Sequence, residues 1–158
     1  MQSDHQTRRE FCIRACQAAS VMAWGGAVSA ILQSCSSDDP LSSGSQNLPQ
    51  IQATAVNGVI TLVIDAGSPL AAVGSAAQVQ HASGTLLVAR TAQNEFTALT
   101  AVCTHQQCTI NGYANQIYTC PCHGSQFNTN GQVTRGPAAA ALRKYATQFA
   151  NDQLSITL

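Results

Sequence analysis

From residue 51 onward, the chain consists of short runs of strand-forming residues separated by turn signals. Asn57-Gly58, Asn111-Gly112 and Asn130-Gly131 favour tight hairpin turns, because both central residues of a type I′ turn need positive φ. Ser83-Gly84 and residues 150–152 are further signals of the same kind. Turn signals at such short spacing favour antiparallel sheets over βαβ units.

The strands expected from this pattern lie on either side of the turns, at residues 53–56, 59–65, 78–81, 85–90, 96–102, 145–149 and 154–158. Only residues 138–142 resemble a helix, and this segment is short and follows a proline. The pattern therefore predicts an all-β domain over residues 51–158. We expect its sheet core to include Tyr113, Tyr118, Tyr145 and Phe149.

A different pattern occupies residues 1–35. Arg8-Arg9 and Phe11 precede a mostly small and apolar stretch at residues 15–32, which is the form of an export signal. The arginine pair resembles the twin-arginine signal of folded exported proteins, the alternative being an ordinary secretion signal with two chance arginines. We therefore expect export by a twin-arginine-type pathway to the periplasmic side of a membrane.

The end of this signal has three possible forms. Leu32-Gln33-Ser34-Cys35 resembles a lipobox, in which Cys35 is lipidated, although Gln33 is not the usual small residue there. Val28-Ser29-Ala30 is instead suited to plain cleavage. Retained as a helix, residues 15–33 would reach about 28 Å and span a bilayer. In each case residues 36–50, rich in Ser and Pro, are expected to be a flexible linker.

Charge excludes one class of partner. Seven Lys and Arg balance seven Asp and Glu, and charged residues make up only 9% of the chain. Too few cations are present to neutralise many phosphates, so the sequence does not predict a nucleic-acid binder. A hydrophobic content of 45% also argues against intrinsic disorder.

The candidate chemistry lies in two loops, residues 103–108 and 120–125. Each contains two cysteines and a histidine, and a hairpin at Asn111-Gly112 would place the loops side by side. A mixed Cys/His set suits tetrahedral zinc or an iron–sulfur cluster. The spacings are not those of zinc fingers, and a zinc site leaves one cysteine on each loop unexplained. Two spare cysteines fit a disulfide in an oxidising compartment, which favours the cluster.

The pattern Cys-x-His-x-x-Cys followed by Cys-Pro-Cys-His-Gly-Ser resembles the signature of Rieske 2Fe–2S proteins, in particular the disulfide-containing type of cytochrome bc complexes. The likeness is close over residues 103–125, and Gly136-Pro137-Ala138 resembles that family's proline loop. The resemblance implies a Rieske-type antiparallel β-sandwich with a small cluster-binding subdomain. It also implies one 2Fe–2S cluster per chain.

By this resemblance, Cys103 and Cys120 ligate the inner iron, and His105 and His123 ligate the outer iron. Cys108 and Cys122 form a disulfide. Gly136 and Pro137 cover the third side of the cluster, and the hydroxyl of Ser125 donates to a bridging sulfide.

Two departures from the family bear on function. Phe127 stands where many bc-type proteins have a tyrosine that donates to a ligand sulfur. Gln106 and Gln107 stand where the family usually has leucine and glycine. The leucine helps to dock the first loop at the quinol site of cytochrome b, so Gln106 weakens the expectation of quinol docking.

The expected function is one-electron transfer, without an independent catalytic site. The chain is either a freestanding carrier or a quinol-oxidising subunit that exchanges electrons with cytochrome b and cytochrome c, tethered to a membrane through its N-terminus. An alternative is the small subunit of a periplasmic oxidoreductase, such as an arsenite oxidase. A structural zinc module is the remaining alternative.

Overall fold

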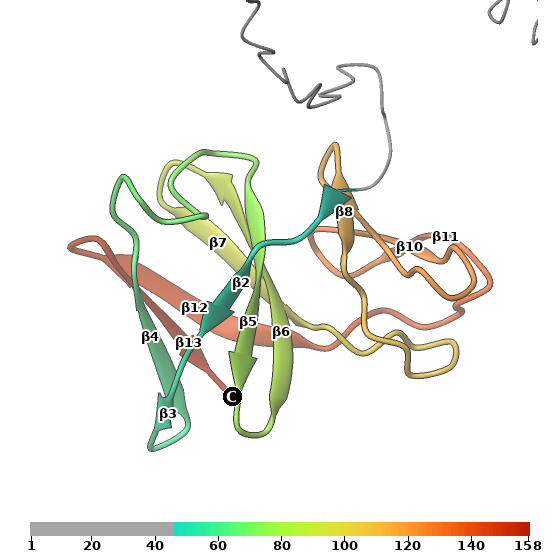
Figure 1. Cartoon of the computed structure of the whole chain (residues 1–158), viewed down its shortest axis with the longest axis horizontal. Helices are drawn as coiled ribbons and strands as arrows, with labels where there is room; N and C mark the ends of the chain where they lie inside the picture. Colours follow the sequence, from blue (N-terminus) through green and yellow to red (C-terminus); the bar gives the residue numbers. More distant parts are fainter. Residues whose placement is uncertain (1–45) are drawn as a thin grey trace, which may run out of the picture. The chain divides into compact units, whose positions relative to one another are not determined.

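The computed structural model describes residues 46–158, which contain thirteen strands and no helix (Figure 1). The prediction of an all-β fold is confirmed. The strands are β1 (Gln46–Asn47), β2 (Gln50–Gln52), β3 (Ala55–Val56), β4 (Val59–Val63), β5 (Ala76–His81), β6 (Gly84–Ala92), β7 (Glu95–Thr100), β8 (Gly112–Ala114), β9 (Ile117–Thr119), β10 (Gln126–Asn128), β11 (Val133–Arg135), β12 (Lys144–Ala150) and β13 (Gln153–Thr157).

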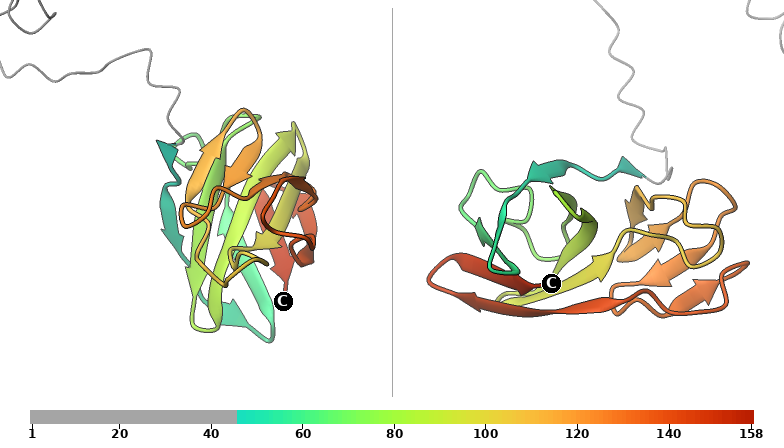
Figure 2. Two further views of the ribbon diagram at one scale, coloured as in Figure 1. Left: turned by 90° about the vertical axis from the view of Figure 1, so that its right-hand side faces the viewer. Right: turned by 90° about the horizontal axis from the view of Figure 1, so that it is seen from below.

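Two sheets make up the domain. The larger has eight strands in the order β2-β5-β6-β7-β12-β13-β4-β3, and it curls around its own core (Figure 2). The smaller has five strands in the order β1-β8-β9-β10-β11 and lies at the right of Figure 1. Both cluster loops leave strands at this end, since the first follows β7 and the second joins β9 to β10.

Two hydrophobic cores fill the domain, and β6 and β7 contribute to both. Alternate residues of a strand point to opposite faces of a sheet. Leu87 and Leu99 pack in the core that also contains the cluster loops, whereas Leu86 and Ala98 pack inside the larger sheet. The continuous burial of these two strands follows from a core on each face.

Most of the predicted turns are present. Asn57 and Gly58 have φ of 50° and 77°, and Asn151 and Asp152 have φ of 50° and 57°, as two-residue hairpin turns require. The turn predicted at residues 111–112 was wrong. Gly112 lies in β8, paired with β1 on one side and β9 on the other, so the strand continues through it.

The turn between β8 and β9 is instead at Asn115 and Gln116, with φ of 50° and 62°. Asparagine tolerates this left-handed region better than most residues, and this permits a turn without glycine. The two loops are therefore joined by a hairpin, but its turn lies four residues later than predicted.

Other expectations needed correction. Strand β2 pairs with β5 in parallel, although only antiparallel pairing was expected. Strands β1 and β2 also begin within the segment expected to be linker, because Leu48 is buried and its amide donates to the carbonyl of Asn111. Residues 138–142, whose composition is helix-like, form no helix, in agreement with the all-β prediction, and Ala138 and Leu142 pack into the core from an irregular segment.

The export signal, the lipobox at Cys35 and most of the predicted linker lie outside the described residues. Over residues 46–158, the structure has no helix of the length and hydropathy needed to cross a bilayer.

Candidate metal centre

The two cluster loops are built as copies of one hydrogen-bonded turn. In the first, the amide of Cys103 donates to the carbonyl of Cys108 (2.9 Å), and the amide of Gln107 donates back to the carbonyl of Cys103 (2.9 Å). The same two bonds recur in the second loop. There the amide of Cys120 donates to the carbonyl of Ser125 (2.9 Å), and that of Gly124 donates to the carbonyl of Cys120 (3.0 Å).

The fifth residue of each turn has a left-handed backbone. Its φ is 57° at Gln107 and 73° at Gly124. This conformation closes the turn. It is unstrained at glycine, whereas a residue with a side chain adopts it at a cost of about 1 kcal/mol.

A disulfide joins Cys108 to Cys122 and ties the two loops together, with a Cα–Cα distance of 6.5 Å. The expected pairing is confirmed. The sulfur atoms of these two residues and of Cys120 all lie within 4.8 Å of one another. Because the disulfide occupies two of these three sulfurs, they do not form a three-thiolate metal site.

Cys103 and Cys120 remain as free thiols, and each is 1% exposed. Burial raises the pKa of Cys120, and a hydrogen bond with the thiol of Cys103 raises it further. The backbone amides of Cys122 and His123 donate to the Cys120 sulfur and act in the opposite direction. Two thiols thus meet at one buried point, where burial outweighs the two amide donors and keeps the pKa of Cys120 raised.

His105 and His123 lie side by side, with ring centroids 4.8 Å apart in an edge-to-face arrangement. His105 is half-buried and His123 is exposed. The Nδ1 atom of His105 is buried and has no hydrogen-bond partner. Buried polar atoms are rarely left unpaired in proteins, and a metal ion is one partner that satisfies an imidazole nitrogen. Two thiols, two imidazoles and this unpaired nitrogen fit an iron–sulfur cluster.

The segment that follows β11 touches both loops. Ser125 is fully buried, and its Oγ accepts a hydrogen bond from the amide of Ala138 (3.0 Å). Since this bond uses an acceptor site of the hydroxyl, its proton is free to donate elsewhere. On the other loop, the hydroxyl of Thr104 donates to the carbonyl of Ala140 (2.6 Å). No pattern in the sequence indicated this contact of Thr104.

Phe127 is fully buried in the same core as Cys103 and Cys120. Across the sheet it pairs with Tyr118, whose ring packs on that of Tyr113 at 4.8 Å. The hydroxyl of Tyr118 is buried without a partner, and burial raises its pKa well above the usual value. The prediction that Tyr118 lies in the core is confirmed.

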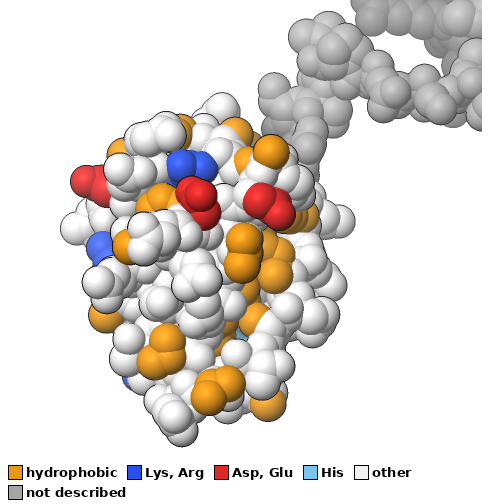
Figure 3. All heavy atoms as spheres, turned by 90° about the vertical axis from the view of Figure 1, so that its left-hand side faces the viewer, with side chains coloured by type: hydrophobic (Ala, Val, Ile, Leu, Met, Phe, Trp, Pro, Cys, Tyr) orange, Lys and Arg blue, Asp and Glu red, His pale blue; other side chains and the backbone are white. Residues whose placement is uncertain are grey.

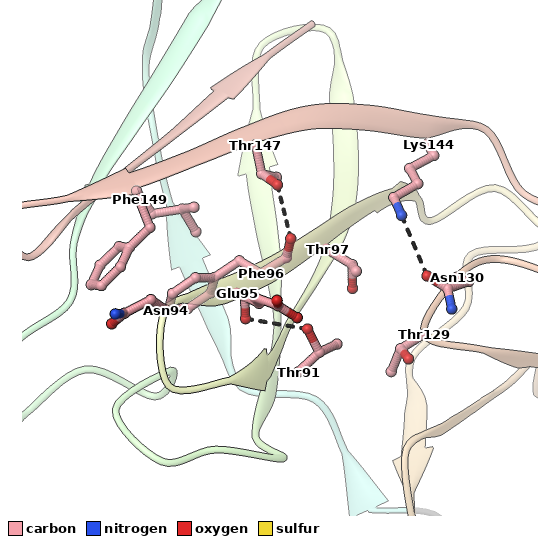
Figure 4. Close-up of a pocket in the computed structure, with 11 residues that line it drawn as sticks. Thr91, Asn94, Glu95, Phe96, Thr97, Thr129, Asn130, Lys144, Thr147 and Phe149 are labelled. Carbon is pink, nitrogen blue, oxygen red and sulfur yellow. Dashed lines mark hydrogen bonds between the residues drawn. The ribbon is translucent and has the colours of Figure 1, made fainter.

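A separate pocket of about 390 Å³ lies between β7, β12 and the turn after β10 (Figure 4). Its lining is mostly polar and includes Glu95, Thr97 and Lys144, and the Lys144 ammonium donates to Asn130 Oδ1 at 3.3 Å. No cysteine or histidine lines it, so it is distinct from the metal centre.

The family model for the Rieske [2Fe-2S] domain matches residues 62–146, which include both loops and the segment after β11. The chain belongs to the Rieske family. A 2Fe–2S cluster is therefore its cofactor, which decides against zinc as the bound metal. The predicted Rieske-type fold is confirmed with it.

The Rieske chain has relatives among cytochrome complexes. It is 44% identical over 61 residues to the cytochrome b6-f complex iron-sulfur subunit of Trichodesmium erythraeum, a match that covers 37% of this chain and 34% of that protein. The match to the subunit of Chlorobaculum thiosulfatiphilum is 37% identical over 62 residues, covering 39% of this chain and 34% of the relative. The chain thus spans about a third of the curated relatives it matches.

A solved structure of naphthalene 1,2-dioxygenase, with phenanthrene bound, has a similar fold. Its TM-score is 0.51 at 17% identity, over 61% of the Rieske chain and 25% of the dioxygenase chain. At this identity the likeness concerns the fold alone.

Proposed function

We propose that this Rieske protein carries single electrons on the periplasmic side of a membrane. Cys103 and Cys120 bind the inner iron of the cluster, and His105 and His123 bind the outer iron. The observation that carries this proposal is how the six Cys and His side chains of the two loops are divided between a disulfide and a set of four candidate ligands. The disulfide uses two of them, and the remaining four are two buried free thiols and a pair of adjacent imidazoles.

The ligand set suits a carrier of moderate to high potential. Two ferric ions and two sulfides carry a net charge of +2, and two thiolates with two neutral imidazoles bring the oxidised centre to zero. Four thiolates would give −2, and an anion accepts an electron less readily than a neutral centre. Rieske centres accordingly have potentials of about −150 to +300 mV, against about −400 mV for plant-type ferredoxins.

The side chains give the electron an exit on one side. Both thiols are buried, whereas His123 is exposed and His105 is half-buried, so a partner reaches the histidine side of the centre first. The second-loop hydroxyl of Ser125, held by Ala138, is free to donate toward the cluster and would favour its reduced form.

The partners of a protein with this centre are a donor and an acceptor of one electron. The relatives of this chain are named as subunits of cytochrome b6-f complexes. This favours a quinol-oxidising subunit that delivers electrons to a c-type cytochrome. The exposed, polar Gln106 at the tip of the first loop favours a freestanding carrier instead. We propose the freestanding carrier, tethered to the membrane by residues 1–35.

Metal analysis and spectroscopy test the proposal. The purified protein should contain about two irons and two acid-labile sulfides per chain and should be reduced reversibly by one electron. Reduction should give the low-average-g spectrum of a histidine-ligated cluster. His105→Ala should abolish that spectrum, whereas the control His81→Ala, in β5 and away from both loops, should retain it.

Stoichiometric zinc without labile sulfide would contradict the whole proposal. Oxidation of a quinol by the isolated protein together with a cytochrome b would contradict only the freestanding role.

A further inference from the structure

The charges of the described residues are divided between two parts of the chain. Residues 100–144, which include both cluster loops, contain no Asp or Glu, and their three cations are Arg135, Arg143 and Lys144. The remaining described residues contain all three acids, Asp65, Glu95 and Asp152, and each of these is exposed. Viewed from the end away from the loops, the surface shows acidic side chains together with Lys or Arg side chains (Figure 3).

The described residues outside 100–144 contain one cation, Arg90. Arg90 is 8% exposed, and its guanidinium donates to the carbonyls of Ala71 and Gln93. Residues 100–144 thus carry a formal net charge of +3, whereas the remaining described residues carry −2, from three acids and Arg90. Such an arrangement orients a charged partner before contact.

A groove of about 720 Å³ is lined by residues of this positively charged stretch, between the first loop and the segment before β12. Val102, Ala140 and Ala141 give it apolar surface, and Val102 is 45% exposed. His105 and Arg143 also line it. An apolar surface, a cation and a cluster histidine therefore share one groove.

Arg143 is exposed and contacts an aromatic ring of its own domain. Its guanidinium carbon lies 4.7 Å from the centroid of the Tyr145 ring, which holds the side chain by a cation–π contact. Residues 100–144 offer no carboxylate to pair with it. Its charge is therefore available at the rim of the groove.

We propose that this groove is the docking surface for a redox protein that presents carboxylates around its own redox centre. The proposal rests on the proposed electron transfer and names the chemistry of the partner. A carboxylate of the partner pairs with Arg143, and the partner's apolar surface covers Val102 and the two alanines. In the complex, the partner's oxidised centre accepts one electron from the reduced cluster through the His105 side, and no covalent bond forms or breaks.

Stopped-flow kinetics test the docking with the cluster-loaded protein. An acidic monohaem cytochrome c serves as the electron acceptor, at ionic strengths from about 0.01 to 0.5 M. Arg143→Gln should lower the second-order rate constant about threefold to tenfold at low ionic strength, and the loss should vanish at high ionic strength. A basic cytochrome of the same size should react more slowly with the unaltered protein and gain from the same substitution.

Lys144→Gln is the matched control. It removes the same charge one residue away, but from a side chain that lines the other pocket and donates to Asn130 (Figure 4). We expect its effect on the rate constant to be less than about twofold. Equal losses in the two variants would overturn the proposal, because net charge alone would then explain both.

A calorimetric titration gives a readout that needs no electron transfer. The oxidised protein is titrated with the acidic cytochrome carrying zinc in place of iron, and Arg143→Gln should weaken binding by about the same factor as the rate constant. Failure of the cluster to cycle reversibly would refute the proposed function but would leave this binding difference intact. Unaltered binding in Arg143→Gln would refute the docking surface. Binding to anionic lipid vesicles or self-association that depends on Arg143, without binding to the cytochrome, would also refute it.

Discussion

At the scale of single residues, Phe127 is the substitution with the clearest electrochemical consequence. It is fully buried in the core that holds both free thiols, and it has no hydroxyl to donate to a ligand sulfur. A hydrogen bond to a charged group contributes about 1.5–3 kcal/mol. Only the part of this energy that differs between the two redox states changes the potential. If that part is about a third, or about 0.5–1 kcal/mol, the change is about 20–40 mV at about 59 mV per 1.4 kcal/mol.

We therefore expect Phe127→Tyr to raise the midpoint potential by about 20–40 mV, measured by voltammetry at one pH. Ser125→Ala should lower it, because that substitution removes a donor. Phe149→Tyr, in β12, is the control and should leave the potential unchanged. An unshifted potential in Phe127→Tyr would mean that residue 127 does not face the ligand sulfur.

Gln107 carries a backbone strain that glycine would remove. Its φ of 57° costs about 1–2 kcal/mol for a residue with a side chain. Glycine loses about 0.5–1 kcal/mol more entropy on folding, so Gln107→Gly should raise the free energy of unfolding by up to about 1 kcal/mol.

Denaturant unfolding of the cluster-loaded protein measures this change. Gln106→Gly is the matched control, since residue 106 is the neighbouring glutamine and has no positive φ. It should destabilise by about 0.5–1 kcal/mol through entropy alone. Destabilisation of equal size in both variants would show that the left-handed backbone of residue 107 is not strained.

At the scale of elements, the disulfide couples the two loops. It closes a loop of about 15 residues, which corresponds to about 3 kcal/mol in the chain-entropy model. Cys108→Ser should lower the free energy of unfolding by about that amount and speed loss of the cluster absorbance on heating. If peptide mapping of the exported protein found both thiols free, the predicted effect would lose its basis.

The sequence predicted elements well where a turn has a single chemical solution. Asn57-Gly58 is such a case, since both residues must take positive φ. The same dipeptide at residues 111–112 lies within a strand, because β1 pairs there from a distant part of the chain. No local pattern reports a pairing partner so far away, and the parallel pairing of β2 with β5 was missed for the same reason.

The metal centre was more predictable than the sheets. The ligands of one cluster must lie close together, and this constrains their spacing in the sequence. The Cys108–Cys122 bond is the part of that prediction found in the structure. The contacts around it were not predictable, since the bond from Thr104 to Ala140 and the groove beside His105 depend on segments brought together by the fold. Threonine and alanine occur in many settings, so neither residue type indicates such a contact in a sequence.

At the scale of the whole molecule, the remaining prediction concerns the tether. If the lipobox prediction is right, the mature protein begins at Cys35 and carries acyl chains. The intact mass of membrane-extracted protein should then exceed that of the 35–158 polypeptide by the lipid mass, and Cys35→Ala should block processing. An N-terminus at Met1 in the membrane fraction would instead support the retained helix.

The sharing of β6 and β7 between the two cores has a consequence for the way the domain opens. Leu87 and Leu99 face the core of the cluster loops, and Leu86 and Ala98 face the other, so neither core can open without exposing a face of these strands. Amide protons of buried residues in β6 and β7 should therefore exchange with solvent deuterium only through global unfolding. Those at the exposed loop tips should exchange far sooner, and mass spectrometry of the deuterated protein would resolve the two groups. The metal centre would then be held by the strands that unfold last.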